Sequence, residues 1–398
     1  MSTPFSIPSN FATCPNCEKT CTSILWCVNC DVAYLVENFK NWSSGDPKLD
    51  DFIRHTQKTA NETMDFLEWI DFSQFDLIKY TGKEGSFSTI YTALWMEGPF
   101  WNWDEAASIW SRGGPTKVIL KRLNDSRELS DQFINQLYDY SKCLNNNTLA
   151  DCFGVTRDNT SNIMFVFRYY NKGNIYSFLD SCNELLCWRD TVDLLWSIAS
   201  GIHKIHEQGL MHGHLHGGNI LVESERDIMD ARVSDTGLHG PPFNTNSEGI
   251  YGVVPFVDPE IFKGSEPTQA SDIYSFGMIM WTISSGERPY HDRPHDRSLI
   301  NDIVAGLRPK PAEGTPTLYI QLMEKCLNAD PLKRPSALDL YILFEKWVVA
   351  ICDDPEPSEI SDQFDRAEIA KFGDFKNYGL IPLSHKGAIY HSRNLNLI

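Results

Sequence analysis

The amino-acid sequence predicts an α+β, bilobal fold: a small β-rich lobe followed by a larger helical lobe, both preceded by a short cysteine-rich module. Three observations carry this prediction. Two Cys-x-x-Cys pairs lie near the N-terminus, short runs of β-branched and aromatic residues begin near Phe75, and longer segments of helical periodicity dominate after Tyr170. The predicted parts are the cysteine-rich module at 1–35, a connector at 36–74, the two-lobed domain at 75–352 and an acidic C-terminal tail at 353–398.

Composition limits the possible classes of protein. The chain has 398 residues and is 42% hydrophobic, enough for one large or two medium domains with proper cores. Its net charge of −18 argues against nucleic acid or an anionic membrane as the main partner. No apolar run approaches the ~20 residues of a membrane span, and no signal-peptide pattern opens the chain. We therefore expect an intracellular, cytoplasmic protein with protein partners, whose cysteines are reduced or metal-bound.

The cysteine-rich module contains two hooks, Cys14-x-x-Cys17 and Cys27-x-x-Cys30, separated by nine residues. Two residues between thiolates let one tight turn aim both at a metal, and two hooks complete a tetrahedral site. The sequence predicts structural zinc on these four ligands, with Cys21 as a spare thiol or a competitor for one position. We expect the module, which has little apolar content, to fold only with the metal. Free thiols in a floppy tail and a redox pair are the alternatives.

The small lobe is predicted from three strands, Leu77–Tyr80, Thr89–Leu94 and Val118–Leu123. The turn between the first two strands resembles the phosphate loop G-x-G-x-x-G-x-V, in which glycines let backbone amides approach phosphates. With Ile90 at the Val position, Gly85 is the one glycine in register. An insertion with three tryptophans, Trp101, Trp103 and Trp110, follows the second strand. It is expected to pack its aromatics on the lobe, or else to bind a partner.

The third strand and the segment after it carry the next landmarks. Val118-Ile119-Leu120-Lys121 is similar to V-A-I-K, whose lysine pairs with phosphates. Apolar spacing predicts a helix at 129–144, with Gln136 on it. In the large lobe, an amphipathic helix at 190–208 leads into His212-Gly-His-Leu-His-Gly-Gly-Asn219. Val233-Ser-Asp235-Thr-Gly comes next in the chain.

These landmarks, in this order, resemble a protein kinase domain of the tyrosine-kinase-like group. In the family, the catalytic loop reads H-R-D-L-x-x-x-N, so His212 and Asn219 match, while Gly213 and His214 stand at the Arg and Asp positions. The Asp272-Ile-Tyr-Ser-Phe-Gly run favours the tyrosine-kinase-like group. With the cysteine hooks and the tail run 388–393, the whole chain resembles an expanded fungal set of kinase-like proteins.

The resemblance implies ATP and Mg²⁺ as cofactors and a protein hydroxyl as phosphate acceptor. Gly85 and Lys121 would contact the phosphates, and Asn219 and Asp235 would hold the metal. The catalytic positions would be His214, Asn219 and Asp235. The resemblance further implies that Arg334 pairs with Glu260 of an Asp258-Pro-Glu motif and that Asp272 braces the lobe.

Three positions depart from the family in ways that predict impaired catalysis. His214 replaces the base, whose loss typically costs 10²–10⁴-fold in rate. Gln136, or alternatively the nearby Glu128, stands for the glutamate that pairs with the strand lysine. Ile119 replaces a small residue against which adenine packs, and overpacking of this kind costs ~1–3 kcal/mol. Gly213 also removes the Arg that would read phosphorylation at Thr245, Ser247 or Tyr251.

The leading hypothesis is therefore a pseudokinase, a signalling scaffold or allosteric partner with weak or no ATP binding. The first alternative is an active, atypical Ser/Thr or Tyr kinase that uses Lys121, Asn219 and Asp235. His214 as its base is disfavoured, because an imidazole is bulkier than a carboxylate and supplies no negative charge. The second is an adaptor whose zinc module does the recognition. A metal at His212, His214 and His216 is disfavoured, because neighbours on an extended loop point different ways. The tail is expected to form a short helix at 364–375 and then to be disordered, with docking on the kinase-like lobe as the alternative.

Overall fold

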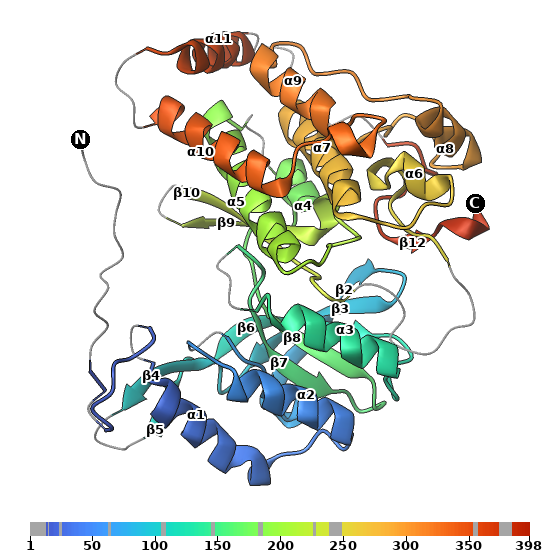
Figure 1. Ribbon diagram of the computed structural model, residues 1–398. Coiled ribbons are helices and arrows are strands. Elements are labelled where there is room, and N and C mark those ends of the chain that lie inside the picture. Colours follow the sequence, from blue (N-terminus) through green and yellow to red (C-terminus); the bar gives the residue numbers. More distant parts are fainter. Residues whose placement is uncertain are drawn as a thin grey trace. The chain divides into compact units, whose positions relative to one another are not determined.

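The computed structural model confirms an α+β fold with a β-rich small lobe and a helical large lobe (Figure 1). It describes residues 13–14, 16–23, 26–62, 65–104, 109–144, 148–181, 186–225, 228–238, 249–352, 357–373 and 384–398. Two compact units divide these residues. The small lobe takes the chain up to 144 and 151–169, and the large lobe takes 148–150 and the remainder.

The small lobe is built on a six-stranded sheet of order β1-β7-β8-β6-β3-β2. Its strands are β1 (Glu68–Trp69), β2 (Phe75–Glu84), β3 (Ser88–Trp95), β6 (Thr116–Leu123), β7 (Cys152–Arg157) and β8 (Ile163–Arg168). Neighbours pair antiparallel except for β1 and β7, which run parallel. One face of this sheet forms the core, with Trp95, Val118, Leu120 and Val166 nearly inaccessible to solvent. All three predicted strands are confirmed.

Residues expected as a connector contribute a helix and a strand to the small lobe. Helix α2 (Pro47–Lys58) is capped by Asp46, whose carboxylate accepts from the Lys48 N–H, and it buries Leu49, Phe52 and Ile53. The Phe52 ring packs edge-on against Tyr138 of helix α3 (Asp131–Ser141), with 5.2 Å between centroids. Strand β1 joins the sheet beside Gly154, where a Cβ atom would lie 2.2 Å from the Glu68 carbonyl. The glycine is therefore required by the close approach of β1.

The insertion of the small lobe folds as a hairpin of β4 (Phe100–Asp104) and β5 (Ile109–Arg112). Arg112 pairs with Glu68 at 2.7 Å and places its guanidinium 3.8 Å from the Phe100 ring centroid. These contacts fasten the hairpin to the sheet. The side chains of the three tryptophans in this insertion lie outside the described part of the chain, so their packing remains a prediction.

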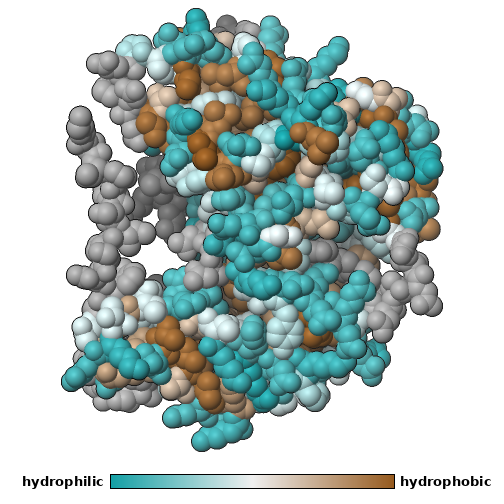
Figure 2. All heavy atoms as spheres, in the orientation of Figure 1, coloured by the Kyte–Doolittle hydropathy of each residue, from teal (hydrophilic) through white to brown (hydrophobic). Residues whose placement is uncertain are grey.

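The large lobe consists mainly of helices. They are α4 (Ile175–Ser181), α5 (Trp188–Glu207), α6 (Pro259–Phe262), α7 (Gln269–Ser285), α8 (Arg297–Val304), α9 (Thr317–Cys326), α10 (Ala337–Cys352) and α11 (Glu359–Gly373). Helix α7 is the core helix, because every residue from Ser271 to Ser284 is buried. Helices α5 and α10 pack along each other, and α5 ends as predicted just before Gly209. Figure 2 shows hydrophobic residues over α10, where Leu338, Ile342 and Val349 are exposed.

Two short strand pairs complete the large lobe. Strands β9 (Ile220–Glu225) and β10 (Ile228–Val233) form one hairpin-like pair that flanks the predicted catalytic loop. The second pair joins β11 (Tyr251–Gly252) to β12 (Arg393–Asn394), near the C-terminus (Figure 1).

The expectation of a disordered C-terminal tail is wrong for the residues that the structure describes. The tail helix is α11, which begins at Glu359, and its Phe364 ring lies 5.5 Å from that of Trp347. Residues 384–398 dock on the large lobe, where β12 pairs with β11 and Leu395 is only 2% exposed. Residues 384–398 are ordered because single aromatic and aliphatic side chains insert into the lobe. Such a pattern lacks the periodicity by which a helix or strand is recognised in a sequence.

In the part of the chain that the structure describes, none of the helices has both the length and the apolar character of a membrane span.

Candidate functional site

The four hook cysteines come together at the N-terminus, as predicted. Their Sγ atoms all lie within 4.8 Å of one another, with 3.8 Å between Cys14 and Cys30 and 3.5 Å between Cys17 and Cys27. A tetrahedral ion with metal–sulfur bonds of ~2.3 Å holds its sulfurs ~3.8 Å apart. The donor set and its spacing therefore fit a metal ion. Cys21 is not part of the cluster.

Hydrogen bonds hold the hooks in place. The Asp31 carboxylate accepts the Cys27 N–H at 2.6 Å across the first turn of helix α1 (Val28–Glu37). Burial opposes ionisation of Cys14, but backbone N–H groups of Cys17 and Asn16 lower the pKa of its thiol to about 7. Burial raises the pKa of Cys27. A cation at the centre would favour the thiolate form of all four ligands.

The cysteine cluster is attached to the small lobe by apolar packing. Trp26, one residue before the second hook, is 1% exposed and stacks on Phe66 at a centroid distance of 5.7 Å. The same apolar group contains Leu35 of α1 and Ala60, with Phe100 of β4 against it. The hooks are therefore continuous with the lobe that carries the predicted phosphate-binding residues.

The small lobe holds two of the predicted nucleotide-binding residues. Lys121 lies on β6, is 5% exposed, and pairs across the sheet with Ile90 of β3 and Phe165 of β8. Gly85 forms the turn between β2 and β3, where its N–H donates to the Ser88 carbonyl at 2.8 Å. Ile119 is a partly buried neighbour of Lys121 on β6. The strand positions are thus those that the motif predicts.

Helix α3 offers no glutamate to Lys121. The helix runs from Asp131 to Ser141 with Ser130 as its N-cap, and its sequence contains aspartates at its two ends but no glutamate. Gln136 lies in the middle of the helix, whereas Glu128 precedes the cap. The boundaries favour Gln136 over Glu128 at the position of the lysine's partner, which remains a prediction.

In the large lobe, Asp272 organises the predicted catalytic loop. Its carboxylate accepts the backbone N–H groups of His212 at 2.7 Å and Gly213 at 2.8 Å, and it contacts the His206 ring at 2.9 Å. Burial would raise the pKa of Asp272, but these partners hold it below its usual value. The His212 ring is fully buried and meets the Ser234 carbonyl at 2.8 Å. Asp272 thus has the bracing role that was predicted for it.

His214, Asn219 and Asp235 are connected through the same loop. The Asn219 side chain donates to the His214 carbonyl at 3.0 Å, and the Ser234 N–H donates to the Asn219 carbonyl at 2.8 Å. Asp235 follows directly, with a backbone φ of +65° that Asp tolerates better than most residues. The large lobe therefore brings together its three predicted catalytic positions, with an imidazole where the family has a carboxylate.

Two of the three histidines in the loop serve different partners. His212 faces Ser234, whereas the His216 Nδ1 accepts the Gly218 N–H at 3.0 Å and its ring stacks on Tyr176. Within the described ranges, the cysteine cluster is the one group of His, Cys, Asp and Glu side chains whose geometry could hold a metal ion. A histidine metal site in this loop therefore has no support.

His214 is expected to remain neutral well below physiological pH. Burial, reinforced by the nearby His212 and His216, lowers the pKa of its imidazole to about 4. An unfolded histidine has a pKa of ~6.5, so between these two values the unfolded chain binds more protons. Stability should therefore fall as pH drops through that window. In urea unfolding at about pH 7 and pH 5, His214→Asn should lose less stability than the wild type. Equal losses of stability in the wild type and in His214→Asn would contradict the lowered pKa of His214.

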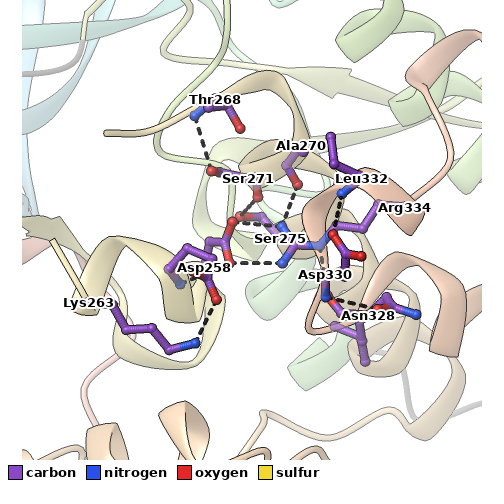
Figure 3. A network of polar contacts seen from close by, with 12 residues as sticks. Asp258, Lys263, Thr268, Ala270, Ser271, Ser275, Asn328, Asp330, Leu332 and Arg334 are labelled. Carbon is purple, nitrogen blue, oxygen red and sulfur yellow. Dashed lines mark hydrogen bonds and ion pairs between the residues drawn. The ribbon is translucent and has the colours of Figure 1, made fainter. Parts of the chain in front are cut away.

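The expected pairing of Arg334 with Glu260 is wrong (Figure 3). Arg334 instead forms two bonds with Asp258, Nη1 to Oδ2 at 2.6 Å and Nη2 to Oδ1 at 3.0 Å. Glu260 contacts Lys263 at 2.7 Å in a partly exposed pair. Asp258 caps α6 and so stands before the helix, facing inward, whereas Glu260 lies on its first turn. The signal that could have identified Asp258 is its N-cap position before Pro259.

Comparisons with known proteins find protein kinases, the family whose landmarks the sequence resembles. Residues 78–343 match the family described as protein tyrosine and serine/threonine kinase. A probable serine/threonine-protein kinase of Dictyostelium discoideum is 25% identical over 299 residues, 72% of this chain and 16% of its own length. The probable serine/threonine-protein kinase roco8 of the same organism is 35% identical over 43% of this chain and 10% of its own. Serine/threonine-protein kinase STY17 of Arabidopsis thaliana is 23% identical, over 59% and 41%. The chain thus spans less than half the length of each of these relatives.

Proposed function

The chain belongs to the protein tyrosine and serine/threonine kinase family, and we propose that within it this protein is a pseudokinase: a signalling scaffold or allosteric partner with weak or no ATP binding. The observation that carries the proposal is His214 at the position of the catalytic base. A protein hydroxyl must lose its proton as it attacks the γ-phosphate, and a carboxylate both accepts that proton and supplies negative charge. A neutral imidazole supplies no charge.

The surroundings of His214 support this assignment. The loop is fixed at both ends, by Asp272 at Gly213 and by the Asn219 amide at the His214 carbonyl. An alternative base would have to enter a loop whose backbone is already held by these bonds. The absence of a glutamate from α3 removes a second charged group that the active state requires. Because such groups act as a unit, their losses do not simply add.

We also propose zinc as the ion of the cysteine cluster, with a structural role. Four thiolates in a closed tetrahedral set are typical of structural zinc, whereas a catalytic zinc keeps one position open for water or substrate. The donor set Cys14, Cys17, Cys27 and Cys30 leaves no such position. We further propose that the protein is intracellular and cytoplasmic. We also propose that it belongs to the tyrosine-kinase-like group, within a fungal set of kinase-like proteins.

Thermal unfolding with ATP tests the nucleotide part of the proposal. A ligand that binds only the folded state stabilises it by ~2.7 kcal/mol at a hundred times its Kd. The wild type should show no Mg²⁺-dependent rise in its unfolding temperature at millimolar ATP. A rise of several degrees that requires Mg²⁺ and disappears in Lys121→Met would contradict weak or absent binding.

The second candidate is an active, atypical Ser/Thr or Tyr kinase. Lys121, Asn219 and Asp235 retain the residue types that hold phosphates and metal. The lowered pKa of His214, about 4, also makes its imidazole about as basic as an aspartate, whose usual pKa is ~3.9. The names of the relatives in Dictyostelium and Arabidopsis favour serine or threonine as acceptor. A zinc-dependent adaptor has less support, because Trp26 and Leu35 turn inward against the small lobe.

A further inference from the structure

The C-terminal segment, residues 384–398, adds a strand to the large lobe. Arg393 and Asn394 pair antiparallel with Gly252 and Tyr251, and the Leu395 N–H donates to the Ile250 carbonyl at 2.7 Å. An extended peptide that extends an exposed edge gains affinity from such main-chain bonds and specificity from side-chain pockets. The segment has both features.

Two side chains anchor the C-terminal segment. The Tyr390 ring packs edge-on against His295 at 4.9 Å and against Tyr176 at 5.7 Å, and its hydroxyl donates to the Pro289 carbonyl at 3.0 Å. Leu395 enters an apolar cluster formed by Val254 and the α8 residues Leu299, Ile300 and Ile303. These anchors stand five positions apart, one aromatic and one aliphatic.

The loop before α8 holds the segment between its anchors. The backbone N–H of His295 donates to the Gly387 carbonyl at 2.9 Å, and the His295 carbonyl accepts from Arg393. A Cβ atom at Gly387 would lie 2.8 Å from Pro294, so the segment passes this loop at a distance that only glycine allows. Recognition therefore depends on a small residue, an aromatic and a leucine in a fixed order.

Charge distinguishes the C-terminal segment from the remainder of the chain. It contains Lys386 and Arg393 and no acidic residue, in a protein with a net charge of −18. A cavity of about 240 Å³, lined by residues that include Asp180, Glu287 and Ser384, remains beside the start of the segment. The segment thus does not fill the whole surface beneath it.

The occupied surface adjoins the predicted catalytic loop. The Tyr176 ring contacts Tyr390 on one side and stacks on His216 on the other, at 6.5 Å and an interplanar angle of 13°. One ring of α4 therefore separates the segment from the loop that carries His214.

We propose that the surface formed by residues 250–254, helix α8 and residues 287–295 is a peptide-docking groove that the chain's own C-terminal segment fills in cis. Its partner in trans is a polypeptide segment with the same pattern, a glycine three positions before an aromatic residue and a leucine five positions after it, which adds the same short strand. A tethered occupant has an effective concentration in the millimolar range. The partner therefore binds only when the tethered segment is released.

A labelled peptide of residues 384–398 tests the docking groove. It is titrated by fluorescence anisotropy against the full-length wild type and against Tyr390→Ala/Leu395→Asp, which removes both anchors from the tethered copy. The double variant should bind the peptide at least about tenfold more tightly than the wild type does. A peptide with the same two substitutions should bind neither protein.

Leu397→Asp is the matched control on the same segment, because Leu397 is 84% exposed whereas Leu395 is 2% exposed. It should behave as the wild type does. If the double variant does not fold, Tyr390→Ala alone is measured. Equal affinities for wild type and released variant, or no binding to a folded released variant, would overturn the proposal. The readout is peptide binding, so it is independent of phosphate transfer.

Discussion

Serine in place of Cys17 should abolish stoichiometric zinc binding and unfold the N-terminal module. Four-thiolate zinc sites in small modules contribute on the order of 10–16 kcal/mol of apparent binding free energy, which is also folding free energy. Cys17 is only partly buried, so the change of sulfur for oxygen should act through the metal rather than through packing. Metal analysis and the protection of the module against limited proteolysis measure the result.

Cys21→Ser is the matched control for this loss. Cys21 is also partly buried and lies between the hooks, but it is outside the cluster of four. The variant should keep one zinc per chain and its protease resistance. If Cys21→Ser loses the metal while Cys17→Ser retains it, the ligand set is wrong. The loss of structure in Cys17→Ser should extend into the small lobe, because Trp26, next to the second hook, stacks on Phe66.

Alanine at Arg334 should lower the free energy of unfolding by about 3–5 kcal/mol. The side chains of Arg334 and Asp258 are 1% and 2% exposed, and removal of one member of a buried pair leaves the other charge without compensation. The Asp258 carboxylate would lose both guanidinium bonds. Chemical denaturation followed by circular dichroism measures the change.

Glu260→Gln provides the comparison, because Glu260 is the residue that the family resemblance pairs with Arg334. Its ion pair with Lys263 is partly exposed, and such pairs contribute ~1 kcal/mol or less. A double-mutant cycle with Asp258→Ala should give a large coupling energy with Arg334→Ala. Large coupling between Glu260 and Arg334, with none for Asp258, would contradict the observed pairing.

The elements that have a local signal in the sequence were predicted correctly. The strand of Lys121, the helix that ends before Gly209 and the cysteine hooks were all predicted because their signals are local: alternation, a helix stop and two fixed spacings. The bracing role of Asp272 followed from the order of the kinase landmarks. Each of these depends on a few neighbouring residues or on motif order.

The partner of Arg334 could not be predicted from the motif alone. Two carboxylates, Asp258 and Glu260, flank Pro259, and the choice between them depends on which way the α6 cap turns. That direction is set by tertiary packing and leaves no periodic trace in the sequence. The one local signal is the N-cap position of Asp258 before Pro259, which the family motif does not take into account.

Disorder was preferred over docking for the tail, and strand β1 of the connector was missed, for a related reason. The apolar residues of 384–398, among them Tyr390 and Leu395, follow neither helical nor strand periodicity, so no regular element is predicted there. Only the presence of complementary partners, such as His295 for Tyr390, makes them anchors. Strand β1 is two residues long, too short to give an alternating pattern, and Gly154 reveals its place only through the neighbouring strand.

Phosphate transfer by the purified full-length protein tests the pseudokinase proposal most directly. Labelled ATP and Mg²⁺ are incubated with the wild type and with Lys121→Met, using a generic protein substrate and the chain itself as acceptors. With His214 in place of the base, the wild type should incorporate no more label than Lys121→Met. Label that accumulates with the wild type and is lost in Lys121→Met would show an active kinase and contradict the proposal.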